Sequence, residues 1–163
     1  MKKTILVLAL FASTASGTTF PNEYVRNEVY KVAKKNNFSP WVLLGLASRE
    51  TDFRHSLVGD KGESFTMFQI HRGFHPEFSG ETSETISIVS AGDWVVKELR
   101  QSLKALGSIN AAIASYNGGR GGVGRAIRKH GPQAYDRATT GGDYSKDVLA
   151  RARLFAEKFG QEY

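Results

Sequence analysis

The sequence predicts a mainly α-helical fold, built as one domain. Three observations carry this prediction. Several segments place apolar residues three or four positions apart, and helix start and stop signals bound these segments. The two-residue alternation of β-strands is almost absent. One polar stretch with several glycines, directly after the second helical segment, is the only irregular insertion that we expect.

The N-terminus reads "MKKTILVLALFASTASG", with two lysines, a short apolar run and then small residues. This order is typical of a secretory signal peptide. The apolar run is far shorter than the roughly 20 residues that a membrane-spanning helix needs. We therefore expect residues 1–17 to be a signal peptide and residues 18–163 to form one domain. The product would be secreted or periplasmic, without stable membrane insertion.

The charge of the chain limits its partners. The net charge of +6 falls to +4 without residues 1–17, which contain two lysines and no acid. A basic exported protein can be attracted to an anionic cell wall, a lipid surface or nucleic acid. No run of basic residues is interleaved with aromatic residues, so nucleic acid is the least favoured of the three. The absence of cysteine excludes disulfides and thiolate catalysis.

The first two helices have clear signals. Asn22 begins "NEYVRNEVYKVAKKNN", in which acids come early and lysines late, as the helix dipole prefers. Ser39 and Pro40 are a capping residue and a first-turn proline, and they predict a second helix from Pro40 to Thr51. Glu50 lies in the last turn of this helix, where the dipole disfavours a negative charge. A carboxyl group at this position tends to keep its proton.

The insertion follows at once. "LVGDKG", residues 57–62, has the composition of a turn or short hairpin. "SFTMFQI", residues 64–70, is short and apolar, so that strand and helix are both open, and we favour a brief helix. The breaker-rich residues 71–84 predict a surface loop.

Four helical segments complete the chain. The longest, from about Thr85 to Leu106, ends at Gly107, and its expected inward stripe is Val89, Val95, Val96, Leu99, Leu103 and Leu106. Ser108 caps a short alanine-rich helix, "INAAIASY". "NGGRGGVG", residues 117–124, predicts a tight loop before a short helix over residues 123–131. Asp143 is the expected cap of a last helix that ends at Gly160.

Several common site patterns fit poorly. Gly119, Gly121 and Gly124 have the G-x-G-x-x-G spacing, but a dinucleotide site needs a preceding strand and a parallel βαβ unit. His71 and His75 are four apart like two metal ligands, yet Gly73 and the following proline argue against a regular helix, and both read more simply as loop residues. No serine lies in a nucleophile elbow. We therefore expect no metal and no cofactor, and the carboxylates remain as the candidate catalytic groups.

Glu50 and Asp60 are the carboxylates to compare. Cleavage of a glycosidic bond needs one protonated carboxyl group and often a second, ionised one. An apolar wall raises the pKa of a carboxyl group, whereas a hydrated loop leaves it low. Glu50, close in sequence to Ala47 and Phe53, suits the first role, and Asp60 in "GDKG" suits the second. Taken alone, each residue is more often a plain surface or turn residue.

Four motifs in order strengthen this interpretation: "SRET", "GDKGESFTMFQIHRGFH", "ASYNGG" and "DYSKDVLARA". They resemble motifs of the goose-type lysozymes and the related soluble lytic transglycosylases, over most of the chain from about residue 38. The resemblance implies a lysozyme-like, two-lobed helical domain with a small irregular β/turn insertion after the catalytic helix. It implies peptidoglycan glycan strands as the partner, and it leaves room for a proteinaceous lysozyme inhibitor.

The resemblance also assigns roles to single residues. Glu50 matches the family's catalytic acid, and Asp60 matches the first of two aspartates that position the attacking water. Substrate-binding positions fall on Gln69, His75, Tyr116, Asn117 and Tyr144. The chain departs from the pattern elsewhere: His71 replaces the second aspartate, Thr66 replaces a glycine, and the segment between Glu50 and Asp60 is shorter.

The resemblance implies an enzyme that cleaves the β-1,4 bond between N-acetylmuramic acid and N-acetylglucosamine. Two chemical outcomes stay open, because one water-positioning aspartate is retained and one is replaced. A muramidase would add water to the bond, whereas a lytic transglycosylase would form a 1,6-anhydromuramic product. Hydrolysis is slightly favoured. A glycan-binding module without turnover is a third alternative, supported by His71 and Thr66 and opposed by the retained Glu50.

Overall fold

The computed structural model describes residues 22–78 and 85–160, and the expected signal peptide at residues 1–17 lies outside them. Mainly helical structure is confirmed. In this part of the chain the α-helices are α1 (Asn22–Lys35), α2 (Pro40–Thr51), α3 (Ile88–Leu106), α4 (Ile109–Gly118), α5 (Arg120–His130) and α6 (Tyr144–Phe159). The 3-10 helices are η1 (Asp60–Gly62), η2 (Pro76–Phe78), η3 (Tyr135–Ala138) and η4 (Thr140–Gly142). The strands are β1 (Ser64–Phe65) and β2 (Ile70–His71).

Helix α2 is the central element. Its residues 42–48 are all buried, which matches a helix that is apolar almost all round. Helix α6 runs across it, and a Cβ atom at Gly45 would lie 2.4 Å from the carbonyl oxygen of Val148. Only glycine therefore allows the two backbones to approach so closely. This crossing brings the last turn of α2 and the first turn of α6 to one place.

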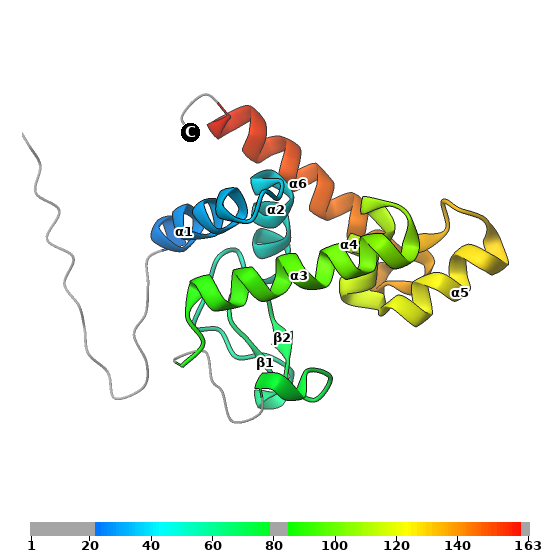
Figure 1. Ribbon diagram of the computed structural model, residues 1–163, viewed down its shortest axis with the longest axis horizontal. Helices are drawn as coiled ribbons and strands as arrows, with labels where there is room; N and C mark the ends of the chain where they lie inside the picture. The colour runs from blue at the N-terminus through cyan, green and yellow to red at the C-terminus, as the bar shows by residue number, and fades with distance from the viewer. Residues whose placement is uncertain (1–21, 79–84, 161–163) are drawn as a thin grey trace, which may run out of the picture.

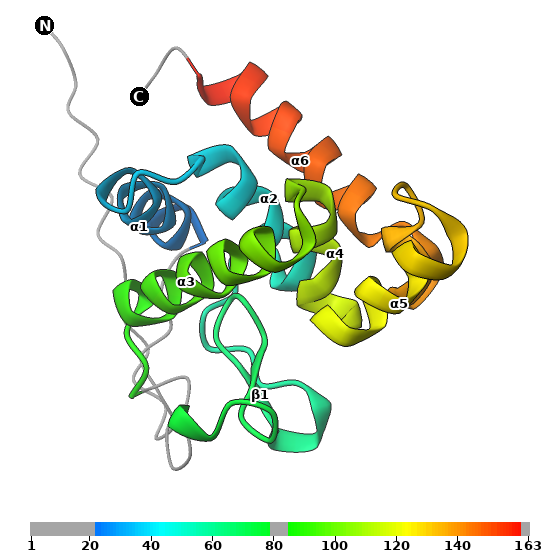
Figure 2. The ribbon, with the colours of Figure 1, turned by 45° about the vertical axis from the view of Figure 1, so that its right-hand side comes forward.

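The remaining elements divide into two lobes. In both views the two-stranded sheet lies on one side of α3 and α6 on the other, while α5 is at the end of the molecule far from α1 (Figure 1 and Figure 2). The main hydrophobic core joins α1, α2, α3, α6, the hairpin and Ile113 of α4. A second cluster of Ala111, Ala114 and Val123 joins α4 to α5. The two-lobed helical architecture expected from the resemblance is thus present.

Capping residues, of which Ser39, Ser108 and Gly107 were expected from the sequence, explain several helix boundaries. The Ser39, Ser87 and Ser108 side chains accept hydrogen bonds from backbone N–H groups in the first turns of α2, α3 and α4. Gly107 ends α3 with φ at +78°, a conformation that glycine adopts without a Cβ clash. None of the helices described combines the length and apolar character that spanning a bilayer requires.

Two expectations for the later helices were wrong in detail. Helix α3 begins at Ile88 rather than Thr85, and Val89 and Leu103 are each 38% exposed, so they do not belong to its inward stripe. Helix α5 begins at Arg120, so the expected loop over residues 117–124 shrinks to the turn at Gly119. Burial of Val123 in the second cluster outweighs the weak helix propensity of the surrounding glycines.

The brief helix expected over residues 64–70 was also wrong. Ser64 pairs with His71 and Phe65 pairs with Ile70 in an antiparallel hairpin. Thr66 and Gln69 both have positive φ, at 68° and 49°, which a right-handed helix cannot contain. The pairing of residues on either side of this turn overrides the local preference.

Candidate active site

Glu50 lies in the last turn of α2, half-buried, at the crossing with α6. The hydroxyl group of Tyr144 donates a hydrogen bond to its Oε1 atom. Burial raises the pKa of the Glu50 carboxyl group above its usual value of 4.5, and the Tyr144 hydrogen bond and the Arg49 charge oppose that rise. The negative charge of Asp60 raises the pKa further. The carboxyl group therefore retains its proton more readily than an ordinary glutamate.

Tyr144 is the first residue of α6 and is only 1% exposed. Burial, followed by the charge of Glu50, raises its pKa well above the usual value of 10, so the phenol remains a hydrogen-bond donor. The Arg49 guanidinium lies 5.4 Å from the centre of the Tyr144 ring. Arg49 in turn forms an ion pair with Asp147, with Nε and Oδ2 2.7 Å apart. These contacts fix the tyrosine from both helices.

Asp60 lies in η1 and is exposed, in contrast to Glu50. It accepts a hydrogen bond from the Ser64 hydroxyl group through Oδ2. Asp60 and Lys61 both have left-handed backbone angles, with φ of 47° and 56°, which cost roughly 1–2 kcal/mol per residue for non-glycine residues. The two carboxyl groups thus occupy different environments, as expected, and are close enough for one charge to act on the other.

A groove of about 470 Å³ lies between the hairpin region, α3 and α4. Its lining includes four of the expected substrate-binding residues, namely Gln69, His75, Tyr116 and Asn117. Glu50, Asp60 and Tyr144 are not among the lining residues. Burial raises the pKa of the Tyr116 hydroxyl group well above its usual value of 10, and the charge of Glu50 raises it further, which indicates that Glu50 lies close to this wall of the groove. Four of the expected site residues are therefore gathered in one hollow, close to Glu50.

The four side chains differ in what they can offer a ligand. The Tyr116 hydroxyl donates to the carbonyl oxygen of Phe68, 2.8 Å away, and so ties α4 to the hairpin. Asn117 accepts from the backbone N–H of Thr140 at 2.7 Å through Oδ1. Its amide Nδ2 makes no hydrogen bond within residues 22–78 and 85–160, and Asn117 is exposed. Asn117 thus has an amide donor that a ligand in the groove could use.

Gln69 has a structural role that the sequence did not reveal. Its Nε2 donates to the carbonyl oxygens of Leu57 and Thr66, at 3.2 and 3.1 Å. A Cβ atom at Gly59 would lie 2.1 Å from its Oε1 atom, so the glycine makes room for the glutamine. Gln69 lines the groove and also holds together the loop that carries Asp60.

Sequence reasoning missed three further groove residues, namely Trp94, Glu98 and Arg120. The Trp94 ring packs edge-on against His75 with ring centres 4.5 Å apart, and its Nε1 donates to Glu77 at 2.8 Å. Glu98 pairs with Arg120 across the groove wall, with Oε2 and NH2 3.1 Å apart. Trp94 and Glu98 are four apart on α3, next to its buried stripe. Only the fold of α3 against α4 shows that this edge faces a groove.

His71, which stands where the family pattern has a second aspartate, also lines the groove. Its Nδ1 accepts from the backbone N–H of Gly73 at 3.1 Å, and its ring packs against Phe74 at 4.6 Å. Within the described ranges, no group of three or more His, Asp or Glu side chains is arranged to hold a metal ion. What the site offers is proton transfer from a carboxyl group beside a hollow with aromatic and amide walls.

Comparisons with known proteins identify the family of the chain. The family model described as Lysozyme g matches residues 19–159. Lysozyme g of Struthio camelus is 30% identical over 144 residues, covering 79% of this chain and 64% of that protein. Lysozyme G of Dromaius novaehollandiae is 29% identical over 141 residues, with the same coverage. Lysozyme g of Takifugu rubripes is 26% identical over 152 residues, covering 85% of this chain and 77% of that protein.

The match therefore spans less than two thirds of the length of the two bird proteins. The match to the family model includes nearly all of the residues described here, from α1 to the end of α6. The chain belongs to the lysozyme g family.

Proposed function

We propose that the protein is a peptidoglycan-degrading glycosidase that cleaves the β-1,4 bond between N-acetylmuramic acid and N-acetylglucosamine. The observation that carries the proposal is the raised pKa of Glu50 in a half-buried position beside the groove. A general acid for this reaction must keep its proton near the working pH. Membership of the lysozyme g family supports the same substrate class. The proposed place of action is outside the cytoplasm, secreted or periplasmic.

Glu50 is the proposed proton donor. It would protonate the leaving oxygen of the glycosidic bond while positive charge builds at the sugar carbon. Once Glu50 has lost its proton, the Tyr144 hydroxyl and the Arg49 guanidinium stabilise the new carboxylate, because both favour the charged form. Burial thus helps Glu50 to keep its proton before the transfer, and Tyr144 and Arg49 lower the free energy of the carboxylate after it.

The glycan strand would lie in the groove. His75, Tyr116 and Asn117 line it, and the Asn117 amide has a donor to offer a sugar oxygen or acetamido carbonyl. Trp94 adds an indole to the same wall, and aromatic rings suit the apolar faces of sugars. Gln69 also lines the groove, but its amide group donates hydrogen bonds to backbone carbonyl oxygens of the loop that carries Asp60.

Hydrolysis is the proposed outcome of the reaction, with Asp60 orienting the attacking water. Asp60 is an exposed carboxylate whose charge reaches Glu50. Lytic transglycosylation is the second candidate, and the presence of a histidine at position 71 favours it, since an imidazole lacks the negative charge of the second carboxylate. In that case Glu50 would act first as acid and then as base, and the muramic acid would close on itself.

Mass spectrometry of muropeptides from purified sacculi tests the proposal. Incubation with the protein is expected to release disaccharide peptides with reducing muramic acid, one water heavier than anhydro products. Glu50→Gln serves as the control, since it preserves shape and hydrogen bonding but carries no acidic proton. Release of anhydro products would favour transglycosylation. Binding to sacculi without any release by the unaltered protein would instead support a non-catalytic glycan-binding module.

A further inference from the structure

Asp136 is a buried acid with no place in the chemistry described so far. It lies in η3 and is 6% exposed. None of the ion pairs in the described part of the chain includes Asp136. Both of its carboxylate oxygens accept hydrogen bonds from Ser145 instead, Oδ1 from the backbone N–H at 2.9 Å and Oδ2 from the hydroxyl group at 2.7 Å. A buried charge is costly unless it is satisfied in this way.

These hydrogen bonds replace the expected helix cap. Asp143 precedes the first residue of α6, yet its side chain makes no capping hydrogen bond, which corrects the expectation from the sequence. Asp136 accepts the N–H of Ser145, the second residue of the helix, from a different segment. A negative charge at this end also interacts favourably with the dipole of the 16-residue helix. Asp136 therefore caps α6 from a distance in the sequence.

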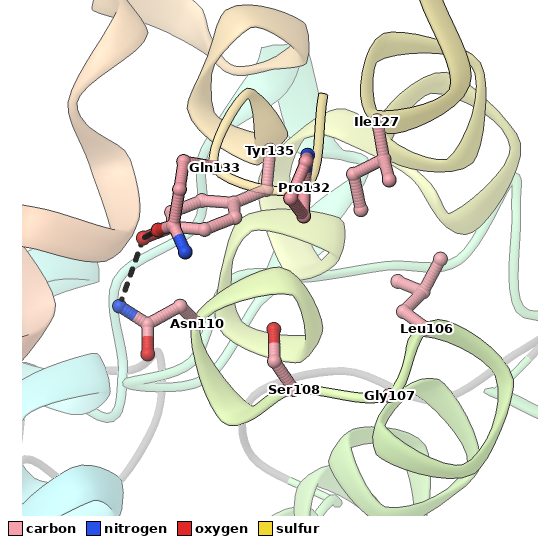
Figure 3. Close-up of a pocket in the computed structure, with 8 residues that line it drawn as sticks. All are labelled: Leu106, Gly107, Ser108, Asn110, Ile127, Pro132, Gln133 and Tyr135. Carbon is pink, nitrogen blue, oxygen red and sulfur yellow. Dashed lines mark hydrogen bonds between the residues drawn. The ribbon is translucent and has the colours of Figure 1, made fainter. Parts of the chain in front are cut away.

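The 3-10 segments hold Asp136 in place. Its carbonyl oxygen accepts from the backbone N–H and the hydroxyl group of Thr139, at 3.0 and 2.8 Å. The Thr139 hydroxyl oxygen also accepts from the backbone N–H of Tyr144 at 3.5 Å. The neighbouring Tyr135 hydroxyl accepts from Asn110 of α4 at 3.2 Å, and Figure 3 shows this bond beside a small pocket. Helix α4 thus anchors η3, and η3 anchors the start of α6.

Tyr144 lies directly between these contacts and Glu50. It precedes Ser145 in the first turn of α6, and its hydroxyl group donates to the Glu50 carboxyl. Any rotation of this turn would carry the Tyr144 ring with it. We propose that Asp136 is a positioning residue, which caps α6 and thereby holds the Tyr144 hydroxyl on the carboxyl group of Glu50. The consequence for catalysis rests on the proposed role of Glu50 as the proton donor.

The groups that act on Glu50 let the effect be predicted. They are Tyr144 from α6, Arg49 from α2 and Asp60 from η1, while the charge of Glu50 acts in turn on Tyr116 from α4. Asp136 is not one of them, so its removal acts on Glu50 through Tyr144. Because the Tyr144 hydrogen bond lowers the pKa of Glu50, loosening it should raise that pKa. We expect a rise of about 0.5–1 pH unit.

The test is a carbon-13 NMR titration of the glutamate side chains, with the Glu50 signal identified by its absence in Glu50→Gln. Asp136→Asn keeps the side-chain shape and removes one acceptor and the charge. It should raise the pKa of Glu50 in the otherwise unaltered chain and have no such effect in Tyr144→Phe. Ala152→Gly is the control, since it weakens α6 two turns away without touching Asp136, and should lower only the melting temperature.

An unchanged pKa of Glu50 in Asp136→Asn, or the same rise in the Tyr144→Phe background, would overturn the proposal. If Asp136→Asn does not fold, Ser145→Ala removes one of the two donors to Asp136 and should raise the pKa of Glu50 to a smaller extent. No rise in Ser145→Ala would also overturn it. The titration needs no substrate. Failure of the unaltered protein to release muropeptides would therefore refute the proposed function alone.

Discussion

Replacement of Tyr144 by phenylalanine removes the hydroxyl group that donates to Glu50 and leaves the buried ring in place. A hydrogen bond to a charged group contributes about 1.5–3 kcal/mol, and this one favours the ionised carboxyl group. One pH unit of pKa corresponds to about 1.4 kcal/mol. The pKa of Glu50 should therefore rise by about 1–2 pH units in Tyr144→Phe.

The sign of the effect on activity follows from the role of Glu50. A general acid works only while it is protonated, so kcat/KM falls as the pH rises through its pKa. In Tyr144→Phe this decline should move to higher pH by the same 1–2 units. The assay is kcat/KM for clearing of sacculi, measured from pH 4 to pH 9, with Tyr24→Phe on α1 as the matched control.

The position of the decline separates two effects of this substitution. Loss of a contact between Tyr144 and the sugar would lower kcat/KM at every pH and leave the midpoint where it was. A midpoint that stays fixed or moves to lower pH would refute the assignment of Tyr144 as the group that sets the acidity of Glu50.

Three further predictions follow from single contacts. Asp60→Asn should move the decline of kcat/KM in the opposite direction, to lower pH, because the Asp60 charge raises the pKa of Glu50; hydrolysis should also fall about tenfold or more, and an unchanged rate would argue against a water-positioning role. Burial lowers the pKa of His55, which is 4% exposed, so the unfolded chain binds more protons below about pH 6.5 and stability should decline as the pH falls from 7.5 to 5. Urea unfolding at both pH values checks this, and His55→Gln should show the smaller difference of the two proteins. Gly122→Ala in α5 should stabilise the protein by about 0.5–1 kcal/mol, since its Cβ would lie 3.6 Å from that of Ala138, whereas Gly118→Ala should destabilise it, since its Cβ would lie 2.5 Å from the Ala138 carbonyl oxygen. Thermal melting of both variants would contradict this if their order were reversed.

The helices could be predicted because their signals are local. Ser39, Ser108 and Gly107 act on residues three or four positions away, and the structure places them as caps. The hairpin could not be predicted in the same way. Ser64 meets His71 only because Thr66 and Gln69 turn the chain with positive φ, and no local pattern requires this of either residue. The glycines before Val123 predict a loop, and only the burial of Val123 in the folded protein explains why they are helical.

The site shows the same division. Glu50 could be placed at the end of an apolar helix, and the gathering of His75, Tyr116 and Asn117 around one groove agrees with the motifs. The contribution of Asp136 could not be foreseen, since its partner Ser145 is nine residues away and Asp143 is the more obvious cap. Gln69 was expected only as a substrate contact. Its structural role could not be predicted, because its hydrogen bonds to the carbonyl oxygens of Leu57 and Thr66 depend on the fold of the loop.

The acidity of Glu50 in the unaltered protein can be measured directly by titrating its side-chain carbon-13 signal and comparing the midpoint with the decline of kcat/KM. We predict that the carboxyl group titrates above its usual 4.5 and that both midpoints coincide. A Glu50 carboxyl group that titrates at or below 4.5, while the protein degrades sacculi at neutral pH, would contradict its role as the proton donor.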